Sequence, residues 1–301
     1  MHEPLVTILL ATYDGEHYLK EQLDSIIQQT HKNWTILASD DGSRDRTLSI
    51  LNEYNVVIQK GPSKGFAANF LSLIINANSN SDYYAFADQD DVWEASKLKH
   101  ALTLLDAVPK NIPALYCGRT YLVDENLSYL GCSPLFKKKP SFKNALAQNI
   151  GGGNTMIFNQ AALTLLRQTN NHNPIVSHDW WAYLLISGSG GTVYYDPTPR
   201  LYYRQHMTNL VGGNSNWLAR FYRVRMLFKG RLKNWVTLNN NHLLEISHVL
   251  TPENKQILAK FELARQSWFG LRLIKIMKLG IHRQTIFGQL GFLVGLLFNK
   301  I

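Results

Sequence analysis

The stretch YYAFADQDDVW, residues 83–93, joins an apolar run to three closely spaced carboxylates. Residues 83–87 have the length and composition of a buried strand, and Asp88, Asp90 and Asp91 follow where that strand ends. Carboxylates so close together repel one another, and burial adds to the cost of keeping them ionised. The stretch therefore predicts a buried strand whose carboxyl end faces a cation.

Strands and helices alternate on both sides of this stretch. Strands are expected at 5–13, 34–40, 56–60 and 83–88, and helices at 15–29, 44–54, 65–77 and 94–108. The alternation predicts an α/β fold with a mostly parallel central sheet flanked by helices. Further along the chain, the runs 114–124 and 127–131 predict a hairpin.

Three polar loops follow strands of the predicted sheet, at 12–14, 40–43 and 88–91. The first reads Thr-Tyr-Asp, the second Asp-Asp-Gly-Ser and the third Asp-Gln-Asp-Asp. Ligands of open α/β sheets bind beyond the carboxyl ends of the strands. We therefore expect the three loops to converge on one site.

The cation at this site is not held by an EF-hand. A calcium loop that starts at Asp88 needs glycine at 93 and glutamate at 99, and the chain has Trp93 and Lys99 there. The sequence also lacks the glycine-rich fingerprints GxxxxGK[ST] and GxGxxG that hold phosphates through backbone amides. The remaining way to hold a diphosphate is through a divalent ion, Mn²⁺ or Mg²⁺, that carboxylates bind and that bridges to the phosphates.

Charge divides the chain into two unequal parts. Of 301 residues with a net charge of +9, residues 217–301 hold 14 Lys and Arg against 3 Asp and Glu, whereas residues 1–216 hold 17 against 19. A near-neutral part suits an enzyme acting on small molecules, and a basic, aromatic-rich part suits an anionic surface. The two cysteines do not form a disulfide framework, which favours a reducing compartment, the cytoplasm.

The basic part predicts helices that lie on a membrane. Residues 216–235 and 261–284 interleave Arg and Lys with Trp, Phe and Leu, and the apolar run 286–298 is too short to span a bilayer. Such helices favour the interface of anionic membranes, so we expect peripheral association with the inner face of the cell membrane. A bundle packed on the rest of the chain and a homo-oligomer contact are the alternatives. No nucleic-acid module is present, and no nucleic acid is expected as a partner.

An ordered set of motifs gives the chain a family resemblance over about residues 4–210. The motifs are LLATYDGEHYLKEQLDSIIQQT, SDDGSRDRT, FADQDDVW, GGGNTMIF, SHDWW and YRQH. The set resembles the family 2 glycosyltransferases, which have the GT-A fold, and FADQDDVW and YRQH are similar to the bacterial cell-surface polysaccharide branch that includes rhamnosyltransferases. The resemblance implies a catalytic domain at 1–215, with a nucleotide-sugar half at about 1–108 and an acceptor half at about 109–215. Residues 216–301 would form the membrane-associating extension.

The resemblance also implies roles for individual residues. The catalytic base would be Asp179. Nucleotide-sugar contacts would come from Thr12, Tyr13, Asp14, Asp40, Asp41, Asp88, Gln89 and Arg204. Acceptor contacts would come from Gly152, Gly153, Asn154 and Trp180. Metal ligands would be Asp88, Asp90 and His206.

The implied reaction moves rhamnose or another hexose, with inversion, from a dTDP- or UDP-sugar to a glycan or polyprenyl-diphosphate-linked acceptor. The chain lacks the QxxRW motif of processive synthases, which indicates one sugar per encounter. A nucleotidyltransferase would have a glycine-rich, basic loop where this chain has TYDGEHY. A glycoside hydrolase with two carboxylates would not need the acidic pair at 40–41. A non-catalytic protein that binds sugars or membranes is the third alternative.

Overall fold

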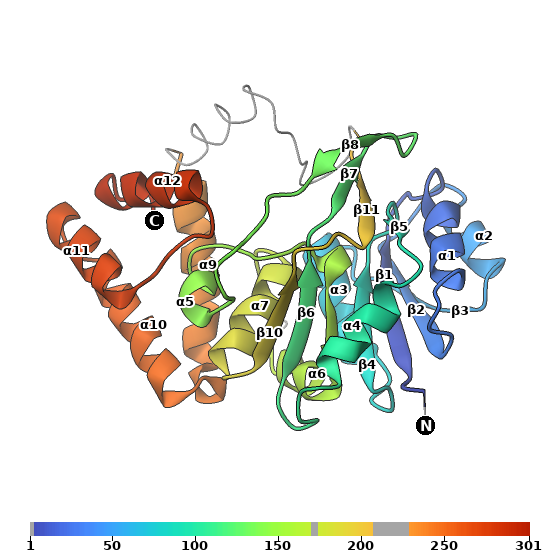
Figure 1. Cartoon of the computed structure of the whole chain (residues 1–301), viewed down its shortest axis with the longest axis horizontal. Coiled ribbons are helices and arrows are strands. Elements are labelled where there is room, and N and C mark those ends of the chain that lie inside the picture. The colour runs from blue at the N-terminus through green and yellow to red at the C-terminus, as the bar shows by residue number, and fades with distance from the viewer. Residues whose placement is uncertain (1–2, 170–173, 207–228) are drawn as a thin grey trace.

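The computed structural model describes residues 3–169, 174–206 and 229–301, and its centre is a seven-stranded sheet (Figure 1). The strands run in the order β10-β6-β9-β4-β1-β2-β3. Their bounds are β1 Val6–Thr12, β2 Trp34–Asp40, β3 Val56–Lys60, β4 Tyr83–Ala87, β6 Ala114–Gly118, β9 Ile157–Asn159 and β10 Thr192–Asp196. Only β9 runs antiparallel to its neighbours in this sheet, so the predicted mostly parallel α/β sheet is confirmed.

Helices cover both faces of the sheet, because successive side chains of a strand point to opposite faces. Ile8 and Leu10 pack with one set of helices, and Leu9 between them packs with the other. The first set is α1 Leu19–Ile27, α2 Thr47–Asn52 and α4 Lys97–Leu105. The second set is α3 Phe66–Asn76, α6 Gln160–Leu166 and α7 His178–Gly188. Each fully buried aliphatic side chain contributes about 1.5–3 kcal/mol to this packing.

A second, four-stranded sheet lies beyond the carboxyl edge of the first (Figure 1). Its strands, in spatial order, are β5 Val92–Trp93, β11 Leu201–Arg204, β7 Tyr121–Val123 and β8 Tyr129–Cys132. The predicted hairpin is thus confirmed only in part: β7 and β8 are antiparallel, but Gly118 ends β6 in the main sheet. Because β11 pairs with β5, which directly follows the loop at 88–91, the end of β11 at residue 204 lies beside that loop, called the acidic loop below.

The C-terminal helices pack on the sheet's second layer. They are α9 Arg231–Glu245, α10 Pro252–Arg265, α11 Phe269–Leu279 and α12 Ile286–Leu297, and they share a core with α7 and with α5 Phe142–Ala145. Trp181 of α7 stacks on His242 of α9, with ring centroids 4.6 Å apart. The region is therefore helical as predicted, and it forms a bundle on the rest of the chain, which was the alternative reading. Residues 216–228 of the predicted segment 216–235 lie outside the described residues.

The length and the composition of the helices decide whether one of them could cross a membrane. In the part of the chain that the structure describes, none is both long enough and apolar enough to cross a membrane.

Candidate functional site

Hydrogen bonds tie the three predicted loops together at the carboxyl edge of the main sheet. The Gln89 amide clamps the backbone of Tyr13: its Oε1 accepts from Tyr13 N at 2.8 Å and its Nε2 donates to Tyr13 O at 2.9 Å. Thr12 Oγ1 donates to Asp40 Oδ1 at 3.0 Å. Gly15 permits the clamp, since a Cβ there would lie 2.3 Å from Gln89 Oε1. The structure thus brings together the loops that the sequence predicted to converge.

The acidic pair at 40–41 is buried, and it accepts hydrogen bonds from its own loop and from the loop that follows β3. Asp40 accepts from Ser43 N at 2.9 Å and from Ser43 Oγ at 2.5 Å. Asp41 accepts from Ser63 N at 2.7 Å and from Gly65 N at 3.0 Å. The pair therefore shapes the loops around the site, and its contact with a nucleotide base stays a prediction.

Two side chains of the first loop, Tyr13 and Asp14, face outward, whereas Thr12 is buried. Tyr13 is 55% exposed, so its ring is open to a ligand. Asp14 has a φ of +45°, an uncommon conformation for a residue other than glycine, and its Oδ1 accepts from Arg44 N at 2.7 Å.

The acidic loop carries more negative charge than its surroundings neutralise. Burial raises the pKa of Asp88 to about 8, and the neighbouring carboxylates of Asp90 and Asp179 add to the rise. Asp91 is fully buried, where Asn154 Nδ2 donates to it at 2.6 Å. Burial and the two neighbouring aspartates also raise its pKa. The influence of Asp179 places the predicted base in the same electrostatic environment as the acidic loop.

A buried lysine behind this loop was not predicted. Lys97 is 1% exposed, and its Nζ donates to Asn154 O at 2.8 Å and lies 3.2 Å from the centroid of the Trp93 ring. Burial lowers its pKa, while the carboxylates of Asp91 and Asp88 oppose that shift. Its charge lowers the pKa of Asp88 and so compensates part of the negative charge of the loop. Sequence reasoning missed Lys97 because a lysine at the start of a helix is normally solvated.

Arg204 and His206 reach the acidic loop from β11. The buried Arg204 guanidinium donates to Asp90 O at 3.0 Å through Nε, and it also contacts the Glu21 carboxylate and the Glu125 backbone carbonyl. His206 Nε2 lies 2.7 Å from Asp90 Oδ2. Arg204 thus braces the loop, and its predicted contact with a diphosphate stays a prediction.

The predicted metal ligands do not form a ready-made cage. Within residues 3–169, 174–206 and 229–301, no three His, Cys, Asp or Glu side chains are arranged to hold an ion. Asp90 and His206 meet in a direct hydrogen bond. Their chemistry nevertheless fits Mn²⁺ or Mg²⁺, because carboxylate oxygens dominate the set and the charges of Asp90 and Asp179 act on the buried Asp88. Oxygens of a bound diphosphate would have to complete such a site.

Asp179 lies in the first turn of α7, next to residues 152–154, which form the predicted acceptor loop. Its Oδ1 accepts from Trp180 N at 2.7 Å, and Oδ2 has no partner among the described residues. The acceptor loop packs tightly on this turn: a Cβ on Gly153 would lie 2.0 Å from His178 Nε2.

Two of the predicted acceptor residues face inward. Asn154 is 3% exposed and Trp180 is 5% exposed, with Trp180 Nε1 donating to Ala145 O at 2.7 Å. Asn154 thus holds Asp91 of the acidic loop, and Trp180 packs in the core against α5. Acceptor contacts stay a prediction for the whole set, Gly152 included.

His178 predicts a measurable acid sensitivity. It is buried against Phe70 without a hydrogen-bond partner among the described residues, and burial lowers its pKa to about 4. Between its ordinary value of 6.5 and 4 the unfolded chain binds a proton that the folded chain does not, so this group makes the protein lose stability as the pH falls. We expect His178→Leu to shrink the difference in Tm between about pH 7.5 and about pH 5.

The exposed His248 provides the matched control, and His248→Leu should leave that difference unchanged. An unchanged difference in His178→Leu would contradict the assignment of a neutral, buried imidazole.

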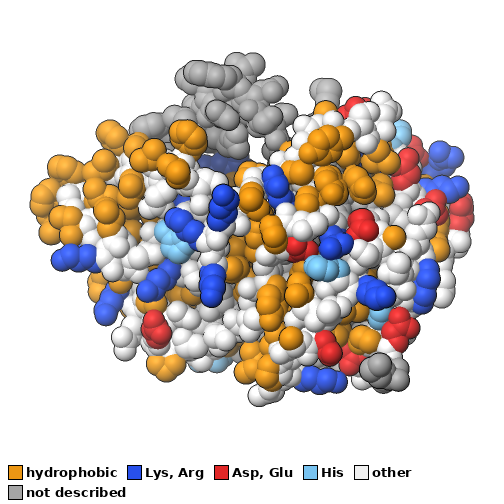
Figure 2. All heavy atoms as spheres, viewed as in Figure 1, with side chains coloured by type: hydrophobic (Ala, Val, Ile, Leu, Met, Phe, Trp, Pro, Cys, Tyr) orange, Lys and Arg blue, Asp and Glu red, His pale blue; other side chains and the backbone are white. Residues whose placement is uncertain are grey.

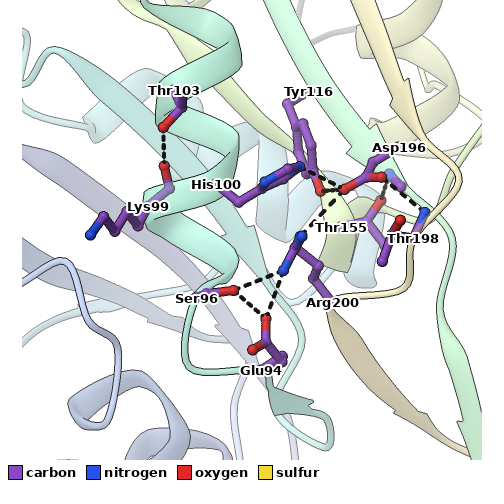
Figure 3. Close-up of polar contacts among 11 residues, drawn as sticks. Glu94, Ser96, Lys99, His100, Thr103, Tyr116, Thr155, Asp196, Thr198 and Arg200 are labelled. Carbon is purple, nitrogen blue, oxygen red and sulfur yellow. Dashed lines mark hydrogen bonds and ion pairs between the residues drawn. The ribbon is translucent and has the colours of Figure 1, made fainter.

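A second polar network joins α4, β6 and β10 (Figure 3). Asp196, at the end of β10, accepts from Tyr116 Oη at 2.9 Å and lies 3.0 Å from His100 Nε2 and 3.4 Å from Arg200 Nε. Arg200 also donates to Ser96 Oγ at 2.8 Å. These bonds fasten α4 to β10 across about a hundred positions of sequence, which is why no local motif could reveal them.

Comparisons with known proteins agree on one family. The sequence profile of glycosyl transferase family 2 matches residues 7–167. The dTDP-rhamnosyl transferase RfbG of Shigella flexneri is 31% identical over 279 residues, which cover 86% of this chain and 93% of RfbG. The UDP-Glc:alpha-D-GlcNAc-diphosphoundecaprenol beta-1,3-glucosyltransferase WfgD of Escherichia coli is 28% identical over 42% of this chain and 49% of its own length.

Among solved structures, the mannosyltransferase PcManGT of Pyrobaculum calidifontis, in complex with GDP-Man and Mn²⁺, shares the fold with a TM-score of 0.52. It covers 93% of this chain and 87% of its own, at 15% identity.

Proposed function

The chain belongs to glycosyl transferase family 2, and from that premise we propose that it moves rhamnose or another hexose from a dTDP- or UDP-sugar to a glycan or polyprenyl-diphosphate-linked acceptor. Membership in this family makes the chain a sugar transferase and sets aside the nucleotidyltransferase, hydrolase and non-catalytic alternatives. The relative named a dTDP-rhamnosyl transferase, which matches over 93% of its own length, supports a dTDP-sugar as the donor. The relative that acts on a diphosphoundecaprenol-linked sugar supports a lipid-linked acceptor.

The convergence of the loops at 12–14, 40–43 and 88–91 near Asp179 carries this proposal. The attacking hydroxyl of the acceptor is a weak nucleophile, and Asp179 takes its proton as the new bond forms. Oδ1 of this carboxylate is held by the start of α7, which leaves Oδ2 to meet the acceptor. A single direct displacement by that hydroxyl inverts the anomeric carbon, and holding both substrates together supplies much of the rate.

The donor would lie over the three loops. Tyr13 has an exposed ring on the nucleoside side, and Gln89 fixes the backbone beneath it. Mn²⁺ or Mg²⁺ held by Asp88, Asp90 and diphosphate oxygens would neutralise charge on the departing nucleoside diphosphate. The hydrogen bond from His206 keeps Asp90 in place, and His206 is the third proposed ligand.

The experiment that tests this function is nucleoside diphosphate release from a panel of dTDP- and UDP-sugars, with and without Mn²⁺. Release from at least one donor, stimulated by a saccharide or lipid-linked acceptor, is expected. No release from any donor with any acceptor would overturn the proposal.

We further propose that residues 1–215 act in catalysis, while 216–301 hold the protein at the inner face of the cell membrane. The outward faces of α11 and α12 are apolar over a wide area: Ile286 is 79%, Phe287 85% and Trp268 62% exposed. Figure 2 shows hydrophobic side chains gathered over these two helices, at the left end of the molecule. Residues 263–301 contain six Lys and Arg and no Asp or Glu, a charge balance that suits anionic lipid.

Membrane association leads to a direct prediction. The protein should float with vesicles that contain phosphatidylglycerol, and Phe287→Glu should abolish flotation because it puts a charge on the apolar face at its most exposed side chain. Gln256→Glu, at an exposed position of α10, makes the same addition of charge elsewhere and should float normally. Dimerisation that Phe287→Glu abolishes, without flotation of the wild type, would assign this face to a second copy of the chain.

A further inference from the structure

A cavity of about 470 Å³ lies among the C-terminal helices. Its described lining comes from α9, α10, α11 and the segment after α12: Lys233, Thr237, Asn241, Glu262, Arg265, Gln266, Arg272, Asn299 and Ile301. None of these residues belongs to the site at the edge of the main sheet. The volume exceeds what a single ion needs and falls within the range of small-molecule sites.

The lining carries uncompensated positive charge. Lys233, Arg265 and Arg272 face one acidic side chain, Glu262, which already binds Arg265 at 2.7 Å. Burial lowers the pKa of Lys233, and the charges of Arg265 and Arg272 lower it further. Cations that repel one another in a partly buried space favour binding of an anion.

Several cationic donors in the cavity remain open. Lys233 Nζ uses two bonds, both to Asn299, and a lysine ammonium has three N–H groups. Arg272 uses three bonds, to the backbone carbonyls of Arg265, Ser267 and Leu296, and a guanidinium has five N–H groups. Arg265 is 8% exposed, and its Nε has no hydrogen-bond partner among the described residues. A phosphate group has the charge and the acceptor oxygens to use these donors.

The position of the cavity identifies the source of the phosphate. Gln266 and Asn299 line it. Trp268 follows Gln266 two positions later in the chain and Phe298 directly precedes Asn299, and these two side chains are 62% and 60% exposed. The cavity therefore borders the apolar face of α11 and α12, where a lipid would place its acyl chains. A free phosphate would gain nothing from that border.

We propose that the cavity lined by Lys233, Arg265 and Arg272 binds the phosphate-bearing headgroup of an anionic lipid. The inference rests on the proposed membrane association, and it adds a defined headgroup site to a general attraction. The phosphate accepts from Lys233 Nζ and from the open arginine N–H groups, while the acyl chains run along the apolar face of α11 and α12.

Calorimetric titration of the full chain with monomeric dioctanoyl phosphatidylglycerol tests this site. Saturable binding is expected, and dioctanoyl phosphatidylcholine should bind about 10-fold more weakly because its headgroup carries a cation. Inorganic phosphate should bind more weakly than the lipid. Equal affinity for inorganic phosphate would identify a free-phosphate site and overturn the lipid assignment.

Two variants separate the cavity from surface charge in general. Lys233→Gln should weaken lipid binding about 10-fold, because one charge-assisted donor is lost, and Lys260→Gln on the exposed side of α10 should not change it. Thr237→Glu places a carboxylate inside the cavity, so it should abolish lipid binding without lowering Tm. Unchanged affinity in both Lys233→Gln and Thr237→Glu would overturn the proposal.

The result of the lipid titration does not depend on the sugar-transfer reaction. Lys233→Gln should release nucleoside diphosphate at the wild-type rate, so a failure of the catalytic proposal is seen in that assay alone. Binding of the soluble lipid without flotation of the protein on vesicles would contradict the membrane proposal, while the headgroup site itself would still be supported.

Discussion

Asp179→Asn is expected to lower the rate of sugar transfer by about 10²–10⁴-fold, the usual contribution of a general base. The amide cannot take the proton of the acceptor hydroxyl, but it can still accept the hydrogen bond from Trp180 N that positions this side chain. Binding of the donor should therefore change little. Turnover under saturating donor and acceptor, together with donor affinity from calorimetry, measures the two effects separately.

The exposed Asp106 provides the control, since Asp106→Asn makes the same chemical change at the end of α4. It should transfer at the wild-type rate. If Asp179→Asn retained full turnover, the base would be another residue, and the proposed roles of α7 and the acceptor loop would have to be reassigned.

Asp90→Asn should lower transfer by at least about 100-fold and remove its dependence on Mn²⁺. The change takes one carboxylate from the proposed cation site while keeping an oxygen for the bond with His206. It also removes a charge that raises the pKa of Asp88, so the protein without ligands should be at least as stable as the wild type. Loss of activity without loss of Tm is the expected signature.

Titration of Mn²⁺ against transfer rate, with Tm measured on the same preparations, checks both parts. Wild-type activity and metal dependence in Asp90→Asn would contradict the proposed ligand. A large fall in Tm would show instead that the bond between Asp90 and His206 holds the fold.

The sequence was sufficient to predict four of the seven strands of the main sheet and the edge at which their loops meet. The strands at 34–40 and 56–60 have the predicted bounds, because turn residues flank short stretches rich in apolar and β-branched side chains there. The polar loops after β1, β2 and β4 meet as expected, since parallel strands end at the same edge.

Contacts between distant residues and the burial of polar side chains were not predictable from local pattern. Lys97 looks like a solvated helix residue, yet β5 and the acceptor loop cover it. Trp180 lies next to the proposed base in sequence, but the helical period turns its ring into the core. The charge excess of the C-terminal region was visible in the sequence, whereas the gathering of Lys233, Arg265 and Arg272 around one cavity required the fold of four helices.

The most direct measurement is calorimetric titration of the wild-type chain with dTDP- and UDP-sugars in the presence and absence of Mn²⁺. We expect at least one of these donors to bind at a single site, more tightly with the ion, and we expect Asp90→Asn to abolish the enhancement. Absence of binding by every donor, with and without Mn²⁺, would contradict the claim that the three strand-end loops form a nucleotide-sugar site.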